Sequence, residues 1–250
     1  MSVDKENTHL SVTQLKMFLR CPLQYYFRYI KELIIPPRSE VTLGKSIHRA
    51  LEENYKQKIE TKEDLPIDYL TDLFSDTWES EVKETLFEED EKPGKIKDEG
   101  VNILRIYHKI VSPKIQPVYV EKEFNLFLDA DFTLKGFIDL VTEEDLIIDH
   151  KTTKRSYSEE QVATDLQLTA YSLAYRMLEG KEERGLRFDV MVRTKEPKIQ
   201  HISTKRTQED INRFLKLVDY VNKAIKTGIF YPRENFMCPK CGYKELCRRW

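Results

Sequence analysis

The chain has 250 residues, with 41 basic and 43 acidic side chains and a formal charge of −2. Hydrophobic residues make up 40% and aromatic residues 11% of the sequence, which supports a substantial globular core and excludes an extended disordered chain. The nearly balanced charge excludes a uniformly basic surface, so any surface that binds nucleic acid must be local.

The N-terminal stretch MSVDKENTHL lacks the apolar core of a signal peptide, and no later run approaches the roughly 20 apolar residues that span a membrane. We therefore expect a cytoplasmic protein with no membrane partner. Ser11 and Gln14 form a capping-box pattern that opens a short helix, which we expect to stop near Pro22. The following stretch, LQYYFRYI, is typical of an aromatic core with arginines at its edge, and stacking on nucleic-acid bases is the alternative.

Leu43, Ile47, Leu51 and Tyr55 recur every four residues, which predicts an amphipathic helix entered at Gly44. A histidine, His48, lies beside this apolar stripe. A lone histidine on a helix is more often structural than a metal ligand, so its role depends on other motifs.

Residues 61–114 are predicted to form a helical insertion with two apolar faces. The faces contain Leu70, Leu73, Phe74 and Trp78, and Ile103, Leu104, Tyr107 and Ile110. Between Glu79 and Glu91 there are seven acids and one lysine, a local charge of 1 − 7 = −6. Such a stretch is usually a solvated face and repels phosphate, so a nucleic acid would have to bind elsewhere.

Three apolar, β-rich runs follow. The first contains Val118, Val120, Phe124, Leu126 and Leu128; the others, 133–141 and 146–150, flank a polar turn and predict a β-hairpin. Glu121 and Glu123 share a face of the first strand, and an exposed acid is the alternative to a site near a metal.

Each hairpin strand carries one acid where a hydrophobic residue is expected. Asp139 follows Phe137-Ile138 and Asp149 follows Ile147-Ile148, so an unpaired carboxylate would be costly in either position and a metal ion would remove that cost. Alternation along a strand places Asp149 and Lys151 together and turns His150 away. Two acids and a lysine fit metal-assisted phosphodiester hydrolysis, and a surface hairpin with a salt bridge is the alternative.

The segment Thr152-Thr-Lys-Arg155 is basic and polar, which suits contacts with phosphates. A helix is predicted over 158–178, with Gln167 and Tyr171 on one face. Strands over 186–193 and 198–203 and a final helix capped at Thr207 complete the pattern. The fold class is therefore α/β with a mixed sheet.

Three cysteines, Cys238, Cys241 and Cys247, lie near the C-terminus with gaps of two and five residues, and the fourth cysteine is Cys21. This distribution suits a metal centre in a reducing compartment better than a disulfide framework. Four thiolates are compatible with an iron–sulfur cluster or with zinc, and unligated thiols are the remaining possibility.

These motifs together resemble the PD-(D/E)XK nuclease superfamily, and more narrowly its RecB-like branch, over nearly the whole chain except 61–114. The stretch SVTQLKMFLRCPLQYYFRYI resembles the opening of RecB- and AddB-type nuclease domains. Gly44-Lys-Ser-Ile-His48-Arg-Ala-Leu51 matches the family's G-x-x-x-H-x-x-L signature, and Gln167-Leu-Thr-Ala-Tyr171 matches Q-x-x-x-Y. The usual proline before the first acid is replaced by Ile138.

The resemblance implies a role for each matched residue, and it favours Glu121 over Glu123 as an acid near the metal because Glu121 follows Val118-Tyr-Val120 as in the family's pattern. His48, Asp139, Asp149 and the His150 carbonyl would bind Mg²⁺ or Mn²⁺, Lys151 would act on the attacking water, and Gln167 and Tyr171 would position the water or the strand. Cys21, Cys238, Cys241 and Cys247 would hold a 4Fe-4S cluster, as in AddB-type and CRISPR-adaptation nucleases.

The expected architecture is a single nuclease domain over 1–250 with a restriction-endonuclease-like mixed sheet flanked by helices, the insertion 61–114, and an iron–sulfur region formed by 232–250 and Cys21. The expected activity is that of a DNA exonuclease on single-stranded ends, in recombination, repair, phage metabolism or CRISPR adaptation, with a helicase or integrase as protein partner. A non-catalytic DNA-end-binding iron–sulfur module is the alternative, and RNA cleavage stays open because a 2′-OH contact leaves no linear signature.

Overall fold

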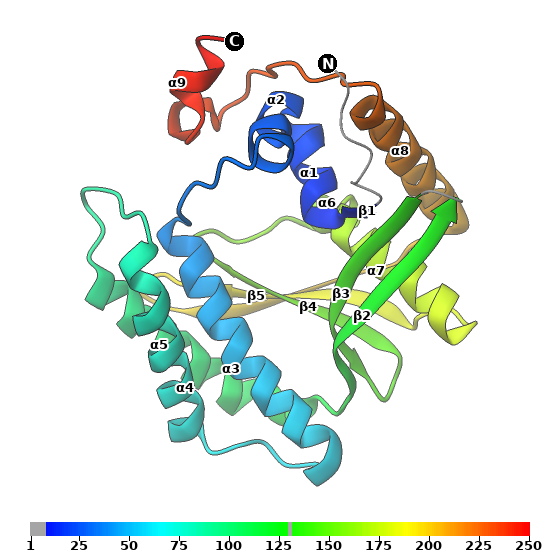
Figure 1. Cartoon of the computed structure of the whole chain (residues 1–250). Helices are drawn as coiled ribbons and strands as arrows, with labels where there is room; N and C mark the ends of the chain where they lie inside the picture. Colours follow the sequence, from blue (N-terminus) through cyan, green and yellow to red (C-terminus); the bar gives the residue numbers. More distant parts are fainter. Residues whose placement is uncertain (1–8, 130–131) are drawn as a thin grey trace. The chain divides into compact units, whose positions relative to one another are not determined.

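The computed structural model describes residues 9–129 and 132–250 (Figure 1). Contacts divide the chain into two compact units. The central unit holds residues 36–122 and 137–205, and the terminal unit holds the described residues of 1–35, 123–136 and 206–250. Strands β2 (Pro117–Asp129) and β3 (Phe132–Thr142) each contribute to both units.

The central unit contains a mixed β-sheet, which confirms the α/β class predicted from the sequence. Strands β3 and β4 (Leu146–Thr153) form an antiparallel hairpin, β4 and β5 (Gly185–Val192) run parallel, and β5 and β6 (Lys198–Thr204) are antiparallel. A parallel pair needs a long connection, and the chain between β4 and β5 supplies one that contains two helices.

Three long helices of the central unit pack together on the sheet. They are α3 (Ser39–Thr61), α4 (Ile67–Glu81) and α5 (Pro93–Ile110). The predicted apolar stripe of α3 is buried, and it shares one hydrophobic core with Phe74 of α4, Leu104 of α5 and Ile148 of β4. Gly100 lies where these helices meet, and a larger side chain there would collide with Phe74 and Leu43. Helix α3 begins five residues before Gly44, so the predicted entry point was too late.

The connection between β4 and β5 is two helices, α6 (Glu159–Ala163) and α7 (Leu166–Glu179), instead of the single helix predicted over 158–178. Asp165 causes the break. Its carboxylate accepts hydrogen bonds from the backbone N–H groups of Gln167 and Leu168, at 2.7 and 3.2 Å, and so starts a new helix.

The acidic segment (residues 79–91) lies against basic side chains of the central unit. Glu91 accepts hydrogen bonds from Lys154 Nζ at 3.0 Å and from the Ser39 hydroxyl at 2.8 Å. Glu88 pairs with Arg38, close to the start of α3. The segment therefore neutralises Lys154, one of the basic residues expected to contact phosphates.

The terminal unit contains the remaining elements, which include a short strand that the sequence did not predict. Ser11 and Gln14 form the expected capping box, and the aromatic stretch after Pro22 is helical, with Tyr25 and Phe27 buried. The elements are β1 (His9–Ser11), α1 (Val12–Arg20), α2 (Pro22–Tyr25), the π-helix η1 (Tyr26–Ile30), α8 (Gln208–Lys226), the 3₁₀ turn η4 (Cys238–Lys240) and α9 (Lys244–Cys247). Within the described ranges, no helix combines the length and apolar character required to cross a membrane.

Candidate active site

The β3–β4 hairpin places the acid–lysine pair of β4 inside the central unit. Asp149 is fully buried, and its Oδ2 lies 2.6 Å from Lys151 Nζ. The His150 ring points to the other face of the strand, where it lies 2.9 Å from the Tyr107 hydroxyl. The expected alternation along β4 is confirmed: Asp149 and Lys151 face one side, and His150 faces the other.

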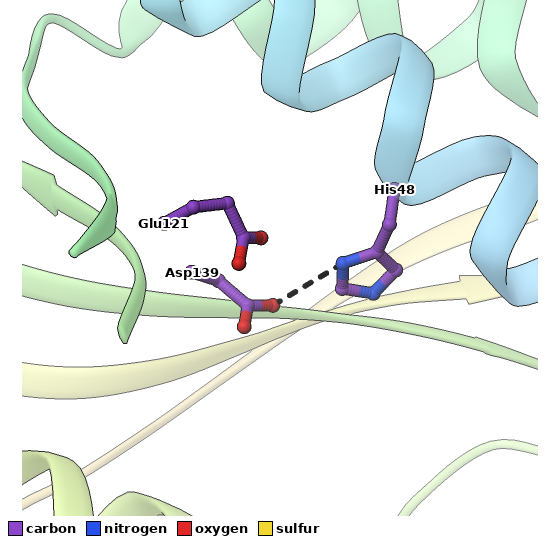
Figure 2. A group of neighbouring side chains, drawn as sticks. All are labelled: His48, Glu121 and Asp139. Atoms are coloured by element: carbon purple, nitrogen blue, oxygen red, sulfur yellow. Dashed lines mark ion pairs between the residues drawn. The ribbon is translucent and has the colours of Figure 1, made fainter. Parts of the chain in front are cut away.

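A second group of side chains lies beside this pair and comes from three different elements. His48 of α3, Glu121 of β2 and Asp139 of β3 each offer one ligand atom, and these atoms lie within 4.8 Å of one another (Figure 2). Imidazole nitrogen and carboxylate oxygen are suitable ligands for Mn²⁺, and oxygen is the usual ligand for Mg²⁺. The group therefore has the composition of a divalent metal site.

The side chain of Glu121 reaches this group through an unusual backbone angle. On a regular strand Glu121 and Glu123 would share a face, yet Glu123 is exposed and accepts a hydrogen bond from Asn125. Glu121 has a φ of 48°, in the left-handed region that few residues other than glycine adopt. Because of this local departure from strand geometry, the two glutamate side chains do not share a face. Glu121, and not Glu123, lies in the group with His48 and Asp139.

The tautomer of His48 follows from its partner. His48 Nε2 lies 2.8 Å from the His150 carbonyl oxygen. Because a carbonyl only accepts, Nε2 carries the hydrogen, and in the neutral ring Nδ1 keeps its lone pair. That Nδ1 faces Asp139 Oδ2 at 3.5 Å (Figure 2). A lone pair directed at carboxylates is satisfied by a proton or by a cation bound among the three residues, and a histidine that donates its other N–H to a carbonyl is typical of metal sites.

The acids of the site repel one another in a buried environment. Burial raises the pKa of Asp149 to about 6, with a further contribution from Asp139. Burial and then the charge of Asp139 raise the pKa of Glu121 to about 7. Among the described residues, neither oxygen of Asp149 has a hydrogen-bond partner of good geometry. A bound cation would stabilise these carboxylates, so the residues fit the metal that their chemistry implies.

Lys151 is protonated in this environment. Burial acts to lower its pKa, but Asp149 and Asp139 outweigh burial and raise it above the usual value. The ammonium also lies 5.1 Å from the centre of the Phe188 ring. Lys151 can therefore donate hydrogen bonds and stabilise negative charge, but it is a poor base at neutral pH.

The two residues of the α7 motif join the site through a chain of hydrogen bonds. Lys151 Nζ donates to Gln167 Oε1 at 2.8 Å, Gln167 Nε2 donates to the Tyr171 hydroxyl at 2.8 Å, and that hydroxyl donates to Asp139 Oδ1 at 2.9 Å. The chain links the lysine of β4 to the acid of β3. Gln167 and Tyr171 thus lie at the position where the sequence motif predicts them.

Of the residues expected to bind the metal, His48 and Asp139 lie in the group with Glu121. Glu121 completes the group with His48 and Asp139, whereas the carboxylate of Asp149 faces Lys151. The His150 carbonyl accepts the hydrogen bond from His48. Sequence reasoning also missed Tyr107 and Asp189, which contact the His150 ring or one another; an aspartate in the apolar strand LRFDVMV was the available signal.

The four cysteines do not form the compact metal site that their spacing suggests. All four thiols are free and partly exposed. Cys21, Cys241 and Cys247 pack against a small core of Leu23, Phe27 and Tyr243 in the terminal unit. Among the described residues, however, no three of the cysteine sulfurs lie within 4.8 Å of one another. The sulfurs are therefore not arranged as one compact iron–sulfur site.

Comparison with known proteins gives a family match over almost the entire chain. The model of the PD-(D/E)XK nuclease superfamily matches residues 9–248. A crystal structure of a proposed exonuclease from Eubacterium rectale has a TM-score of 0.62 at 14% identity, with 97% of this chain and 88% of that chain covered. A second structure, of the protein SSO0001, has a TM-score of 0.48 at 13% identity, with 98% and 88% covered. No protein with a curated description is significantly similar in sequence.

Proposed function

The chain belongs to the PD-(D/E)XK nuclease superfamily, and from this we propose that it hydrolyses phosphodiester bonds in DNA with the help of a divalent metal. The observation that carries the proposal is the meeting of the His48–Glu121–Asp139 group with Asp149 and Lys151 at one hairpin. A binding module would not need a half-buried lysine beside Asp149, which is fully buried, because such an arrangement is costly to maintain.

Each residue of the site has a role that follows from its contacts. His48, Glu121 and Asp139 would hold Mg²⁺ or Mn²⁺, and the resemblance adds Asp149 and the His150 carbonyl as further oxygen ligands. When bound, the ion supplies charge that polarises the phosphate and activates water. Lys151, held as an ammonium by Asp149, orients the water and stabilises the charge that develops on the phosphate. Gln167 and Tyr171 keep Lys151 and Asp139 in register through their hydrogen bonds.

The substrate we propose is a DNA end, with single-stranded DNA cleaved exonucleolytically. The family match and the similarity to the proposed exonuclease from Eubacterium rectale support this choice. The pathway would be recombination, repair, phage metabolism or CRISPR adaptation in the cytoplasm, with a helicase or an integrase as partner. The alternative is a DNA-end-binding module without catalysis.

We also propose that the four cysteines hold a 4Fe-4S cluster. Burial raises the pKa of the Cys247 thiol, and the charges of Cys21, Cys241 and Cys238 raise it further, so the four thiols are near enough to interact. Two observations support the proposal: the cysteine spacing resembles that of AddB-type nucleases, and Cys21, Cys241 and Cys247 pack against one small core of the terminal unit.

The proposed activity is tested with Lys151→Ala. The purified protein is incubated with Mg²⁺ or Mn²⁺ and end-labelled single- and double-stranded DNA and RNA. Cleavage by the variant should fall by roughly 10²- to 10³-fold, the cost of losing a key electrostatic group, while the variant still binds Mn²⁺ and, with Mn²⁺ bound, stays folded at the assay temperature. Lys181→Ala, which removes an exposed lysine paired with Asp145, is the matched control.

Turnover by Lys151→Ala at the wild-type rate would contradict the mechanism. A wild type that binds DNA ends but cleaves none of the substrates would support the binding module instead.

A further inference from the structure

The far face of β4 carries a buried polar network that no step of the proposed chemistry uses. Tyr107 of α5 is fully buried and lies 2.9 Å from His150 Nε2 and 3.0 Å from Asp189 Oδ2. Tyr55 of α3 contacts the same hydroxyl, at 3.2 Å, and its ring lies parallel to the His150 ring. Asp189 of β5 is the direct neighbour of His150 in the parallel register.

The directions of these hydrogen bonds are fixed by a count of hydrogens. The Tyr107 hydroxyl has one hydrogen, which it donates to Asp189. It must therefore accept from the other two partners, and His150 Nε2 carries the hydrogen that points at it. The His150 Nε2–H meets its acceptor only in this orientation of the ring, so the contact with Tyr107 holds the ring in place.

The negative charge of Asp189 is anchored separately from Tyr107. Arg187 pairs with Asp189 at 2.7 Å, and His201 Nδ1 lies 2.6 Å from its Oδ1. These partners, against the opposing effect of burial, hold the pKa of Asp189 below its usual range. Because two cationic or donor side chains already compensate the buried carboxylate, it provides Tyr107 with a fixed acceptor.

His150 connects this network to the metal group through its backbone. Its N–H donates to Asp139 Oδ2 at 3.1 Å, and its carbonyl accepts from His48 Nε2 at 2.8 Å. Two residues of the His48–Glu121–Asp139 group thus take their orientation from the backbone of one residue, whose ring is held by Tyr107. A shift of the ring would be transmitted to Asp139 and His48 within a single residue.

We infer that Tyr107 and Asp189 are positioning residues for the metal site, and that they act through His150. This inference rests on the proposed function, since it presumes that His48 and Asp139 bind a metal. It also gives α5 a role: the helix lies in the region that looks like an insertion in the sequence, yet it supports the strand that carries Asp149 and Lys151.

The test is a double-mutant cycle of Tyr107→Phe and His150→Phe, read out by Mn²⁺ binding in calorimetry and by the Mn²⁺ concentration that gives half-maximal cleavage. Each single variant should weaken Mn²⁺ binding by roughly 10- to 100-fold, as loss of a group that orients a metal ligand does. The double variant should be no weaker than the weaker single variant, because both changes break one connection.

The control is Tyr175→Phe, which removes another buried tyrosine hydroxyl bonded to a carboxylate, here Asp145 at 2.6 Å, at the start of β4. Measurements are made well below the melting temperature of each variant, and Tyr175→Phe should bind Mn²⁺ as the wild type does. Wild-type Mn²⁺ binding by Tyr107→Phe, or additive losses in the double variant, would overturn the inference. A wild type that binds no Mn²⁺ would instead overturn the proposed metal site.

Discussion

Asp64 is a residue whose charge stabilises the central unit away from the active site. Its carboxylate accepts hydrogen bonds from Ser112, Asn54 and the buried Lys58, at 2.6, 2.8 and 2.9 Å. Burial acts to raise the pKa of Asp64, but the Ser112, Lys58 and Asn54 hydrogen bonds together lower it below its ordinary value. A lowered pKa means that the ionised form is the one the fold prefers.

We predict that Asp64→Asn lowers the free energy of unfolding at pH 7 by roughly 3 kcal/mol, the scale of breaking a buried ion pair. The stabilisation by Asp64 is complete at pH values above the pKa of its carboxyl group in the unfolded chain, about 4. It is lost as the pH falls through the lower pKa of the folded state. Urea unfolding of both proteins between pH 7 and pH 3 should therefore show a difference that shrinks below about pH 4. A difference independent of pH would exclude a role for the charge.

At the residue scale, the sequence predicts which residues form the site better than it predicts where their side chains lie. Asp139, Asp149 and Lys151 are recognisable because charged residues interrupt apolar strands, and alternation correctly assigns their faces. Glu121 could not be separated from Glu123 by alternation, since the positive φ of Glu121 is a tertiary effect that no pattern records. The roles of these residues in catalysis stay predictions.

At the scale of elements, the structure adds a prediction about the N-terminus of α7. Asp165 caps this helix, which carries Gln167 and Tyr171 into the site. Asp165→Ala should cost about 1 kcal/mol of unfolding free energy, the usual value of such a cap. Asp165→Asn keeps an oxygen acceptor without the charge and should cost only a fraction of that, so equal losses in both variants would point to the charge and not to the cap.

Long periodic elements and the capping box at Ser11 were predictable, whereas the short strand β1 and the cap at Asp165 were not. The apolar stripe of α3 and the hairpin of β3 and β4 follow from spacing alone, because burial imposes the period. The break at Asp165 was not predicted because the apolar pattern continues through it. Strand β1 was not predicted because it is three residues long, too short for any period to appear.

At the scale of the whole molecule, the proposed cluster would connect the two ends of the chain. Cys21 and the C-terminal cysteines both belong to the terminal unit and are separated by more than two hundred residues of sequence. A crosslink that closes so long a loop stabilises a fold by roughly 5 kcal/mol in a chain-entropy model.

We predict that anaerobically purified protein is brown, with a broad absorption band at roughly 400 nm that zinc sites lack. Cys21→Ser should lose this band and its iron, and should unfold at a lower temperature than the wild type. Colourless anaerobic protein with one bound zinc, or full iron content in Cys21→Ser, would contradict the cluster. Iron and zinc are measured in the same samples by elemental analysis.

Residues 61–114 contain a contact that the sequence does not predict. Its helices are visible as two apolar faces, yet the sequence gives no sign that Tyr107 contacts His150. That contact joins residues 43 positions apart, and nothing local distinguishes Tyr107 from any other buried tyrosine. The connection exists only in the folded chain.

The acidic segment has a consequence for how the protein responds to ionic strength. Arg38 and Lys154 are paired with Glu88 and Glu91 in partly exposed contacts, which salt weakens. If DNA is the substrate, salt also weakens its phosphate contacts, so added salt first releases basic side chains and then competes with the nucleic acid. Cleavage should pass through a maximum as NaCl is raised. In the double variant Glu88→Gln/Glu91→Gln the rise at low salt should be smaller, because the pairs with the acidic segment are absent from the outset while Lys154 keeps its 3.4 Å contact with Glu40.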